Sequence, residues 1–255
     1  MAKLTLSSPD NGNLMTAVMA GEIRQACQDI QDMAGDEGLS LVLVTGSGPC
    51  FSVGQDRLPA AAGASASDET AAQTDLGWID DRQAASALAA LPMPVMIAIN
   101  GDAFDQGLEL ALAGDIRVAV TEARFAFTSL AQGVLPWDGG TQRLPRLVGA
   151  AWARDMLLTG RVVDSTEALA MGLVNRVFPR EELMAEAQRL ADSIAAGGPV
   201  AARYVKEAVW KGMDLSLDQG LGLEADLNVI LQSTSDRAEG IRSFLERRPP
   251  RFSGA

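Results

Sequence analysis

Two nearly uninterrupted apolar runs constrain the fold of this chain more than any other feature. They are LSLVLVTG at 39–46 and PVMIAI at 94–99, and a glycine-containing turn follows each. A strand that lacks polar–apolar alternation is buried on both faces, which is typical of a parallel sheet covered by helices. Apolar side chains at helical spacing between Met15 and Met33 precede the first run. The sequence therefore predicts an α/β fold.

The predicted elements change along the chain from a mixture of strands and helices to mostly helices. Residues 59–77 are rich in Ala, Ser and Gly, a composition typical of a mobile loop or a loosely packed segment. We predict a core domain over 1–195 and a helical C-terminal region over 196–255. Further short strands are predicted at 115–120, 123–127 and 173–178. Helical patterns dominate from about residue 140, at 139–148, 150–159, 165–171, 180–196, 199–211, 214–231 and 236–247.

The chain of 255 residues contains no histidine, which excludes many kinds of catalytic site. Ser-His-Asp and Cys-His groups need an imidazole, and so does the commonest zinc site. Acid–base chemistry must therefore use Asp, Glu, Lys, Tyr or Cys. A formal charge of −12 disfavours binding to nucleic acid. Two cysteines, no apolar run of membrane-spanning length and no signal-peptide pattern lead us to expect a cytoplasmic protein.

Two glycine-containing turns are the first candidates for a functional site. FSVGQD at 51–56 follows the first apolar run, and INGDAFDQG at 99–107 follows the second. A turn between a strand and a helix directs free backbone N–H groups towards one point. Two such turns side by side can present two donors to a single oxygen, as an oxyanion hole requires. The alternative is that both are ordinary connecting turns of an α/β fold.

Five segments, taken in their order along the chain, resemble the successive signatures of the crotonase family, the enoyl-CoA hydratase/isomerase superfamily. The resemblance covers nearly the whole chain, from residue 9 onward. It implies a spiral of β-β-α turns, with a helical C-terminal region that forms trimers or dimers of trimers. The segments are FSVGQD (51–56), INGDAFDQGLELALAGDIRVA (99–119), GVLPWDGGTQRLPRLVG (133–149), LLTGRVVDSTEALAMGLVNRVFP (157–179) and EGIRSFLERRPPRFSG (239–254).

The resemblance also implies binding of an acyl-CoA thioester, whose enolate two backbone N–H groups stabilise. By motif position these belong to Gln55 and Gln106. The family usually has glycines around the second donor, whereas Asp105 and Gln106 stand here before Gly107, which predicts a narrower and more polar pocket. The residues implied in CoA binding are Asp56, Arg57, Leu58, Lys206 and Phe252.

Glu109 stands where hydratases of the family carry their first catalytic glutamate. It lies three residues beyond Gln106 on the same predicted helix, so the two share one face. A carboxylate beside an apolar thioester pocket has a raised pKa, which suits proton transfer near neutral pH. The alternative is a solvated helix residue, which the apolar residues around it in GLELALAG disfavour.

The second glutamate of the hydratases is replaced. Ser129 occupies its motif position, and a hydroxyl cannot store a proton as a carboxylate does. Asp138, in LPWDGGTQRL, is a candidate catalytic partner because some family members use an acid in this turn, one position earlier than Asp138. The alternative role of Asp138 is to cap the helix that begins at GGTQRL.

These residues give several hypotheses about activity. The first is hydration of an enoyl-CoA or dienoyl-CoA, with Glu109 moving the proton and Asp138 or Ser129 as its partner. Double-bond isomerisation is the second, since it needs one base. Thioester hydrolysis or decarboxylation, and a non-catalytic acyl-CoA-binding oligomer, are the further alternatives. In each case we expect no metal and no separate cofactor, because coenzyme A is part of the substrate, and no membrane or nucleic-acid partner.

Overall fold

The computed structural model describes residues 1–34, 39–54 and 83–255. The 59–77 segment lies outside these ranges, and so do four predicted site residues: Gln55, Asp56, Arg57 and Leu58. What the sequence predicts for these residues therefore stays a prediction.

A five-stranded sheet in the order β1-β2-β3-β5-β8 forms the centre of the molecule, and every neighbouring pair of strands is parallel. The two apolar runs form β2 and β3, which are buried almost throughout, so the predicted parallel sheet is confirmed. Edge strand β1 is not among the predicted strands, and only Leu6 is buried in it. The strands are β1 (Ala2–Leu6), β2 (Val42–Gly46), β3 (Val95–Ile99), β5 (Ile116–Val120) and β8 (Arg176–Phe178).

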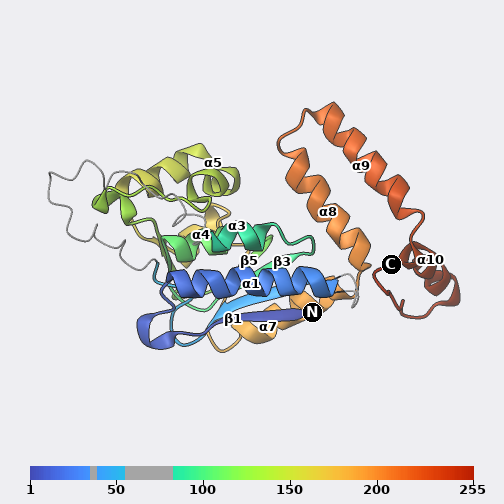
Figure 1. Cartoon of the computed structure of the whole chain (residues 1–255), viewed down its shortest axis with the longest axis horizontal. Coiled ribbons are helices and arrows are strands. Elements are labelled where there is room, and N and C mark those ends of the chain that lie inside the picture. Colours follow the sequence, from blue (N-terminus) through green and yellow to red (C-terminus); the bar gives the residue numbers. More distant parts are fainter. Residues whose placement is uncertain (35–38, 55–82) are drawn as a thin grey trace, which may run out of the picture.

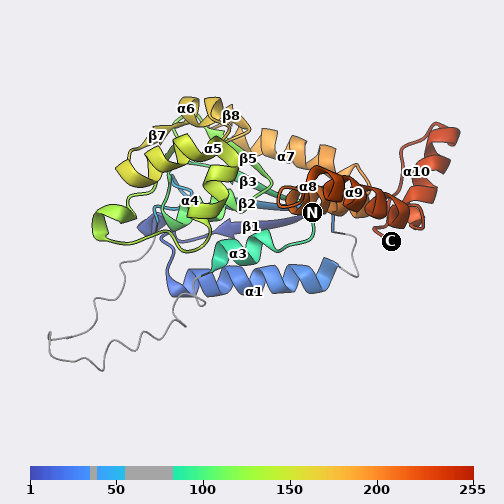
Figure 2. The same cartoon turned by 90° about the horizontal axis from the view of Figure 1, so that it is seen from above.

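Helices cover both faces of this sheet (Figure 2). Helices α1 (Ala17–Ala34) and α3 (Ala84–Ala89) lie on one face, and α7 (Leu183–Ala195) lies on the other. Helix α1 buries Ile23, Cys27 and Ile30, which are spaced four and three residues apart as on one helical face. The apolar core lies between these helices and the strands.

A smaller sheet brings the two predicted turns together. Its strands are β4 (Ala103–Phe104), β6 (Arg124–Ala126) and β7 (Val163–Asp164), in that order. The backbone N–H of Phe104 donates to the carbonyl oxygen of Ser52 at 3.0 Å, and Ser52 forms a parallel bridge with Ala103. The described part of the 51–56 turn therefore lies directly beside the start of α4 (Gln106–Leu112).

The segment after β6 forms one wall of the site. A short 3₁₀ helix, η2 (Ser129–Gln132), leads through a turn to α5 (Gly140–Thr159). Gly149 interrupts α5 with φ 80° and ψ 159°, at the residue that separates the two helices predicted from the sequence. Helix α6 (Ser165–Ala170) follows β7.

The last three helices extend away from the sheet (Figure 1). They are α8 (Pro199–Gly212), α9 (Leu217–Leu231) and α10 (Ser235–Glu246), and α8 packs against α9. Large apolar side chains on them are exposed, including Val205, Trp210, Leu217, Val229 and Phe244. Apolar surface on this scale is typical of an interaction site. Within the described ranges, no helix has the length and apolar character needed to cross a membrane.

Candidate active site

Helix α4 sets the positions of Gln106 and Glu109, which share one of its faces. All seven residues of this helix are buried, including both polar ones. Gly107 allows the close approach to the first turn, because a Cβ atom there would lie 2.5 Å from the carbonyl oxygen of Ser52. The start of α4 is therefore pressed against the 51–54 segment.

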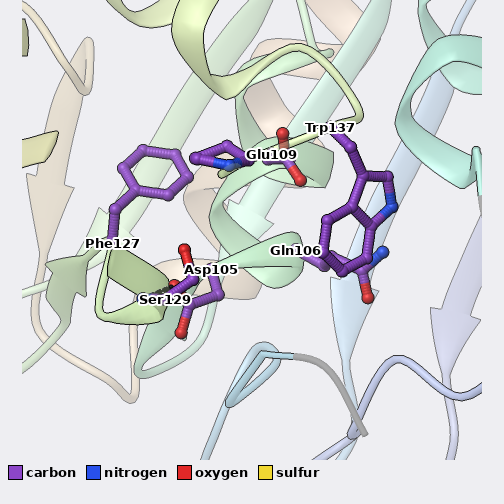
Figure 3. Close-up of a pocket in the computed structure, with 7 residues that line it drawn as sticks. Asp105, Gln106, Glu109, Phe127, Ser129 and Trp137 are labelled. Carbon is purple, nitrogen blue, oxygen red and sulfur yellow. Dashed lines mark hydrogen bonds between the residues drawn. The ribbon is translucent and has the colours of Figure 1, made fainter. Parts of the chain in front are cut away.

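A small cavity of about 10 Å³ lies beside α4. In Figure 3 the aromatic rings of Phe127 and Trp137 lie on opposite sides of it, and the carboxylate of Glu109 lies between them. The cavity brings together three of the predicted site residues, Gln106, Glu109 and Ser129. Among the described residues, its lining is Asp105, Gln106, Glu109, Phe127, Ser129, Pro136 and Trp137.

The described residues hold the carboxylate of Glu109 through its Oε1 atom. Its Oε1 accepts the backbone N–H groups of Asp138 and Gly140, each at 2.8 Å. Within the described part of the chain, no residue bonds Oε2, so this oxygen remains available to a ligand in the cavity. The residue is 1% exposed, so the alternative of a solvated helix residue is wrong.

The pKa of Glu109 is raised to about 7, mainly by burial and also by the nearby charge of Asp138. The N–H groups of Gly140 and Asp138 and the charge of Arg143 act in the opposite direction. The predicted rise of this pKa is confirmed in direction and cause. A carboxyl group that is partly protonated near neutral pH is suited to general acid–base catalysis.

Asp138 caps a different helix from the one predicted. Its Oδ2 accepts the N–H of Ala85 at 2.6 Å, and its Oδ1 accepts the N–H and the hydroxyl of Ser86 at 2.9 and 2.6 Å. These groups belong to the first turn of α3, whereas Gly139 is the N-cap of α5. The predicted cap of the helix at GGTQRL is therefore wrong, because Glu109 takes the free N–H of Gly140 instead.

The side chain of Asp138 does not line the cavity. It is 3% exposed, and burial raises its pKa, whereas its bonds to Ser86 and Ala85 lower it. The guanidinium of Arg143 donates to the backbone carbonyl of Asp138 and adds a positive charge beside both acids. A catalytic role for Asp138 stays a prediction.

Asp105 has a place in the site that the sequence did not reveal. It precedes α4 with φ 45° and ψ −117°, in the positive-φ region that L-residues seldom adopt. Its Oδ1 accepts the backbone N–H groups of Thr128 at 2.7 Å and Ser129 at 3.0 Å, and its Oδ2 accepts the Thr128 hydroxyl at 2.6 Å. The only signal in the sequence is an aspartate where the family usually has a glycine.

Gln106 contributes both a backbone and a side-chain group to the cavity. Its N–H is the first of α4, so it has no partner within the helix. Its side-chain amide is buried, and neither Oε1 nor Nε2 is bonded by any of the described residues. An amide in this state is costly unless a ligand satisfies it.

An apolar groove continues from this cavity and shares Phe127, Ser129 and Pro136 with it. Its volume is about 330 Å³. This is within the range of small-molecule sites, and its apolar lining suits a hydrocarbon chain. The remaining lining residues are Leu130, Val134, Leu135, Thr141, Arg154, Leu157 and Leu158.

The remaining predicted CoA-contacting residues lie away from the cavity. The ammonium of Lys206 pairs with Asp115 at 2.9 Å and donates to the carbonyl oxygen of Met93 at 3.2 Å, which ties α8 to the core. Phe252 lies against Gly198 and Gly240, so the C-terminal tail packs against the start of α8 and the middle of α10. A contact of Lys206 or Phe252 with CoA stays a prediction.

Comparison with known proteins agrees with this geometry. The family model of enoyl-CoA hydratase/isomerase matches residues 1–255. The crotonyl-CoA hydratase of Syntrophomonas wolfei is 33% identical over 99% of this chain and 94% of its own. The 2,3-dehydroadipyl-CoA hydratase of Escherichia coli is 34% identical over 98% of this chain and 94% of its own.

A crystal structure of an enoyl-CoA hydratase from Bacillus anthracis superposes with a TM-score of 0.88 at 33% sequence identity, covering 99% of this chain and 95% of that one. The fold, the order of the motifs and the full-length family match therefore agree. The chain belongs to the enoyl-CoA hydratase/isomerase family of enzymes, within the crotonase superfamily.

Proposed function

We propose that this enzyme adds water to the double bond of an enoyl-CoA thioester. The observation that carries the proposal is the carboxylate of Glu109, buried beside the cavity and held through one oxygen while the other is open. Relatives named as hydratases over nearly their full length support the choice of reaction.

The proposed reaction places the thioester oxygen between the backbone N–H groups of Gln55 and Gln106. These donors stabilise the negative charge that develops on this oxygen as the enolate forms. The water oxygen bonds to the β-carbon, one water proton leaves, and a proton is added at the α-carbon. Glu109 moves a proton in this sequence. Of its predicted partners, Ser129 lines the cavity, and Asp138 acts on Glu109 through its backbone N–H.

The test follows the absorbance of the conjugated double bond while crotonyl-CoA is consumed. Glu109→Gln keeps an oxygen that can accept both N–H groups but cannot transfer a proton, so we expect at least a hundredfold loss of kcat. The matched control is Glu122→Gln, the same chemical change at an exposed residue, which should leave the rate unaltered. An active Glu109→Gln enzyme would show that another group carries the proton.

Isomerisation is the second candidate, because Ser129 stands where a second acid would be. A 3-enoyl-CoA ester distinguishes it, since the isomerase would create conjugation rather than remove it. Release of free thiol from an acyl-CoA would instead identify a hydrolase, and loss of CO₂ from a malonyl-type thioester a decarboxylase. Tight acyl-CoA binding without turnover or exchange of the α-protons would identify a non-catalytic binder.

Several broader properties belong to the same proposal. We infer a homotrimer or dimer of trimers, which the exposed apolar residues of the C-terminal region, 196–255, support. The proposed acyl-CoA site then lies in the core, 1–195, and the reaction uses no metal or separate cofactor. The contacts with CoA are proposed for Asp56, Arg57 and Leu58, together with Lys206 and Phe252. A cytoplasmic location completes the proposal, and light scattering of the purified protein tests the assembly.

A further inference from the structure

We propose that Asp105 is the second carboxylate of this site, which takes the proton from the attacking water while Glu109 protonates the α-carbon. This inference rests on the proposed hydration. It answers the question that the replacement of a glutamate by Ser129 leaves open. Both carboxylates line the same cavity, and Figure 3 shows Asp105 beside Ser129 on the side of the cavity opposite Trp137.

The backbone of Asp105 has an unfavourable conformation, so the surrounding structure must hold the residue in place. The residue adopts φ 45° and ψ −117°, and backbone strain of this kind is concentrated at functional sites. An aspartate before a helix ordinarily accepts N–H groups of that helix, yet Asp105 makes no such bond with α4. Its side chain is directed instead at the 128–129 segment, which forms the neighbouring wall of the cavity.

The hydrogen bonds of Asp105 leave capacity for a water molecule. An ionised carboxylate has about four acceptor positions. Two donors occupy Oδ1 and one occupies Oδ2, so Oδ2 can accept one further O–H. The three donors also fix the orientation of the carboxylate at the wall of the cavity.

Glu109 differs from Asp105 in ways that suit the complementary task. It is buried more deeply, and two backbone N–H groups hold it through Oε1 alone. Burial raises its pKa to about 7, so a share of the molecules carries the proton at neutral pH. Two carboxyl groups in contrasting environments are the usual arrangement for a paired acid and base.

The alternative partners are less suited to activate water. All three hydrogen bonds of the Asp138 carboxylate are made to the first turn of α3, and its side chain does not line the cavity. Ser129 lines the cavity, but a neutral hydroxyl is a weak base. Asp105 is the other carboxylate in the described lining of the cavity.

The proposed hydration adds one water molecule to the double bond and leaves both carboxyl groups as they began. Asp105 takes one proton of the water as the water oxygen bonds to the β-carbon. The π electrons move towards the thioester oxygen, where the N–H of Gln106 stabilises them. The enolate then collapses as the carboxylic acid of Glu109 gives its proton to the α-carbon. The proton on Asp105 returns to Glu109 through solvent, which restores both groups.

Asp105→Asn separates this role from a structural one. Asparagine is among the residues that best tolerate positive φ. Its Oδ1 can accept the N–H groups of Thr128 and Ser129, and its Nδ2 can donate to the Thr128 hydroxyl after that hydroxyl rotates. The variant keeps the geometry and removes the base. Asp105→Gly is a second variant that removes the carboxylate and also relieves the positive φ.

Two assays on the full-length enzyme then distinguish the role of Asp105 from that of Glu109. The first is hydration of crotonyl-CoA, followed by absorbance. The second is exchange of the α-protons of butyryl-CoA in D₂O, followed by NMR, which needs a proton carrier at the α-carbon but no attacking water. We expect both Asp105 variants to lose 10²–10⁴-fold in the hydration kcat and to keep exchange within about threefold. Glu109→Gln should lose both activities.

Asp102→Asn is the matched control. This carboxylate stands three residues earlier, pairs with Arg124 and lies outside the cavity lining, so both activities should persist. Wild-type hydration by a folded Asp105→Asn enzyme would overturn the inference and leave the proposed function intact. Loss of exchange together with hydration in both Asp105 variants, at unchanged Tm, would also overturn it, because Asp105 would then shape the pocket. Unchanged hydration by Glu109→Gln would refute the role of Glu109 as the proton carrier, whereas a wild-type enzyme that does not hydrate crotonyl-CoA would refute the proposed function itself.

Discussion

The backbone N–H of Asp138 donates to Oε1 of Glu109 at 2.8 Å. The carboxylate of Asp138 in turn accepts the backbone N–H groups of Ala85 and Ser86 in the first turn of α3. One residue of the turn before α5 thus joins three helices around the cavity. The carboxylate of Glu109 owes its orientation to this turn and its raised pKa mainly to burial. The activity and the stability of the protein should therefore depend on pH through the same group.

Hydration should weaken as pH rises through about 7. Burial raises the pKa of Glu109 to about 7, and the proposed acid is active only while it is protonated. We expect kcat/KM for crotonyl-CoA to be flat in mildly acidic solution and to fall about tenfold per pH unit above the pKa. Measurement of initial rates across the pH range checks this. Wild-type rates that rise steadily to pH 9 would contradict the assignment of Glu109 as the acid.

The stability of the wild-type enzyme should fall over the same range. Glu109 has a higher pKa in the folded protein than its ordinary value of 4.5. Its contribution is therefore fully present below 4.5 and is lost as pH rises through about 7. Glu109→Gln lacks this loss, so it should exceed the wild type by about 3 kcal/mol at alkaline pH and by little in acid. Urea unfolding at acidic and alkaline pH measures the difference, and a constant difference would be inconsistent with a buried, titrating Glu109.

Asp138→Asn should reduce stability and shift the activity profile. The amide nitrogen would replace one oxygen that accepts an N–H of α3, leaving two donors facing each other, at a cost of about 1–3 kcal/mol. Removal of the negative charge should also lower the pKa of Glu109, because that charge helps to raise it. We expect the alkaline loss of kcat/KM to begin at lower pH, with a maximal kcat within about tenfold of the wild type. A loss of kcat at every pH would instead assign Asp138 a direct part in the chemistry.

The sequence predicts the architecture well where the signal is local. The β2 and β3 strands follow from continuous apolar runs, and the break in α5 follows from a glycine at 149. The β1 strand is not among the predicted strands, although its apolar residues Ala2, Leu4 and Leu6 alternate with polar ones as in a half-buried strand. The β7 strand has only two residues, which is too short for any periodicity. Glu109 is predicted from its motif position in the family resemblance, and its apolar neighbours favour a buried carboxylate over a solvated one.

The other site residues depend on contacts that spacing does not encode. Asp138 bonds residues more than fifty positions earlier, whereas its spacing favoured the adjacent helix. The direction of the Asp105 side chain follows from a positive φ that is unusual for aspartate. A local pattern therefore identifies the helix that carries the acid, and only the tertiary structure identifies the groups that face it.

Gln106→Met should stabilise the protein while keeping the backbone donor. The Gln106 amide is buried, and among the described residues it has no hydrogen-bond partner. Methionine has a similar length and no polar group that requires a partner, so we expect a gain of about 1–3 kcal/mol, or several degrees in Tm. The matched control is Gln142→Met on the exposed side of α5, which should change stability by less than about 0.5 kcal/mol. Thermal unfolding without ligand measures both variants. A marked loss of stability in Gln106→Met alone would mean that the amide is satisfied in solution.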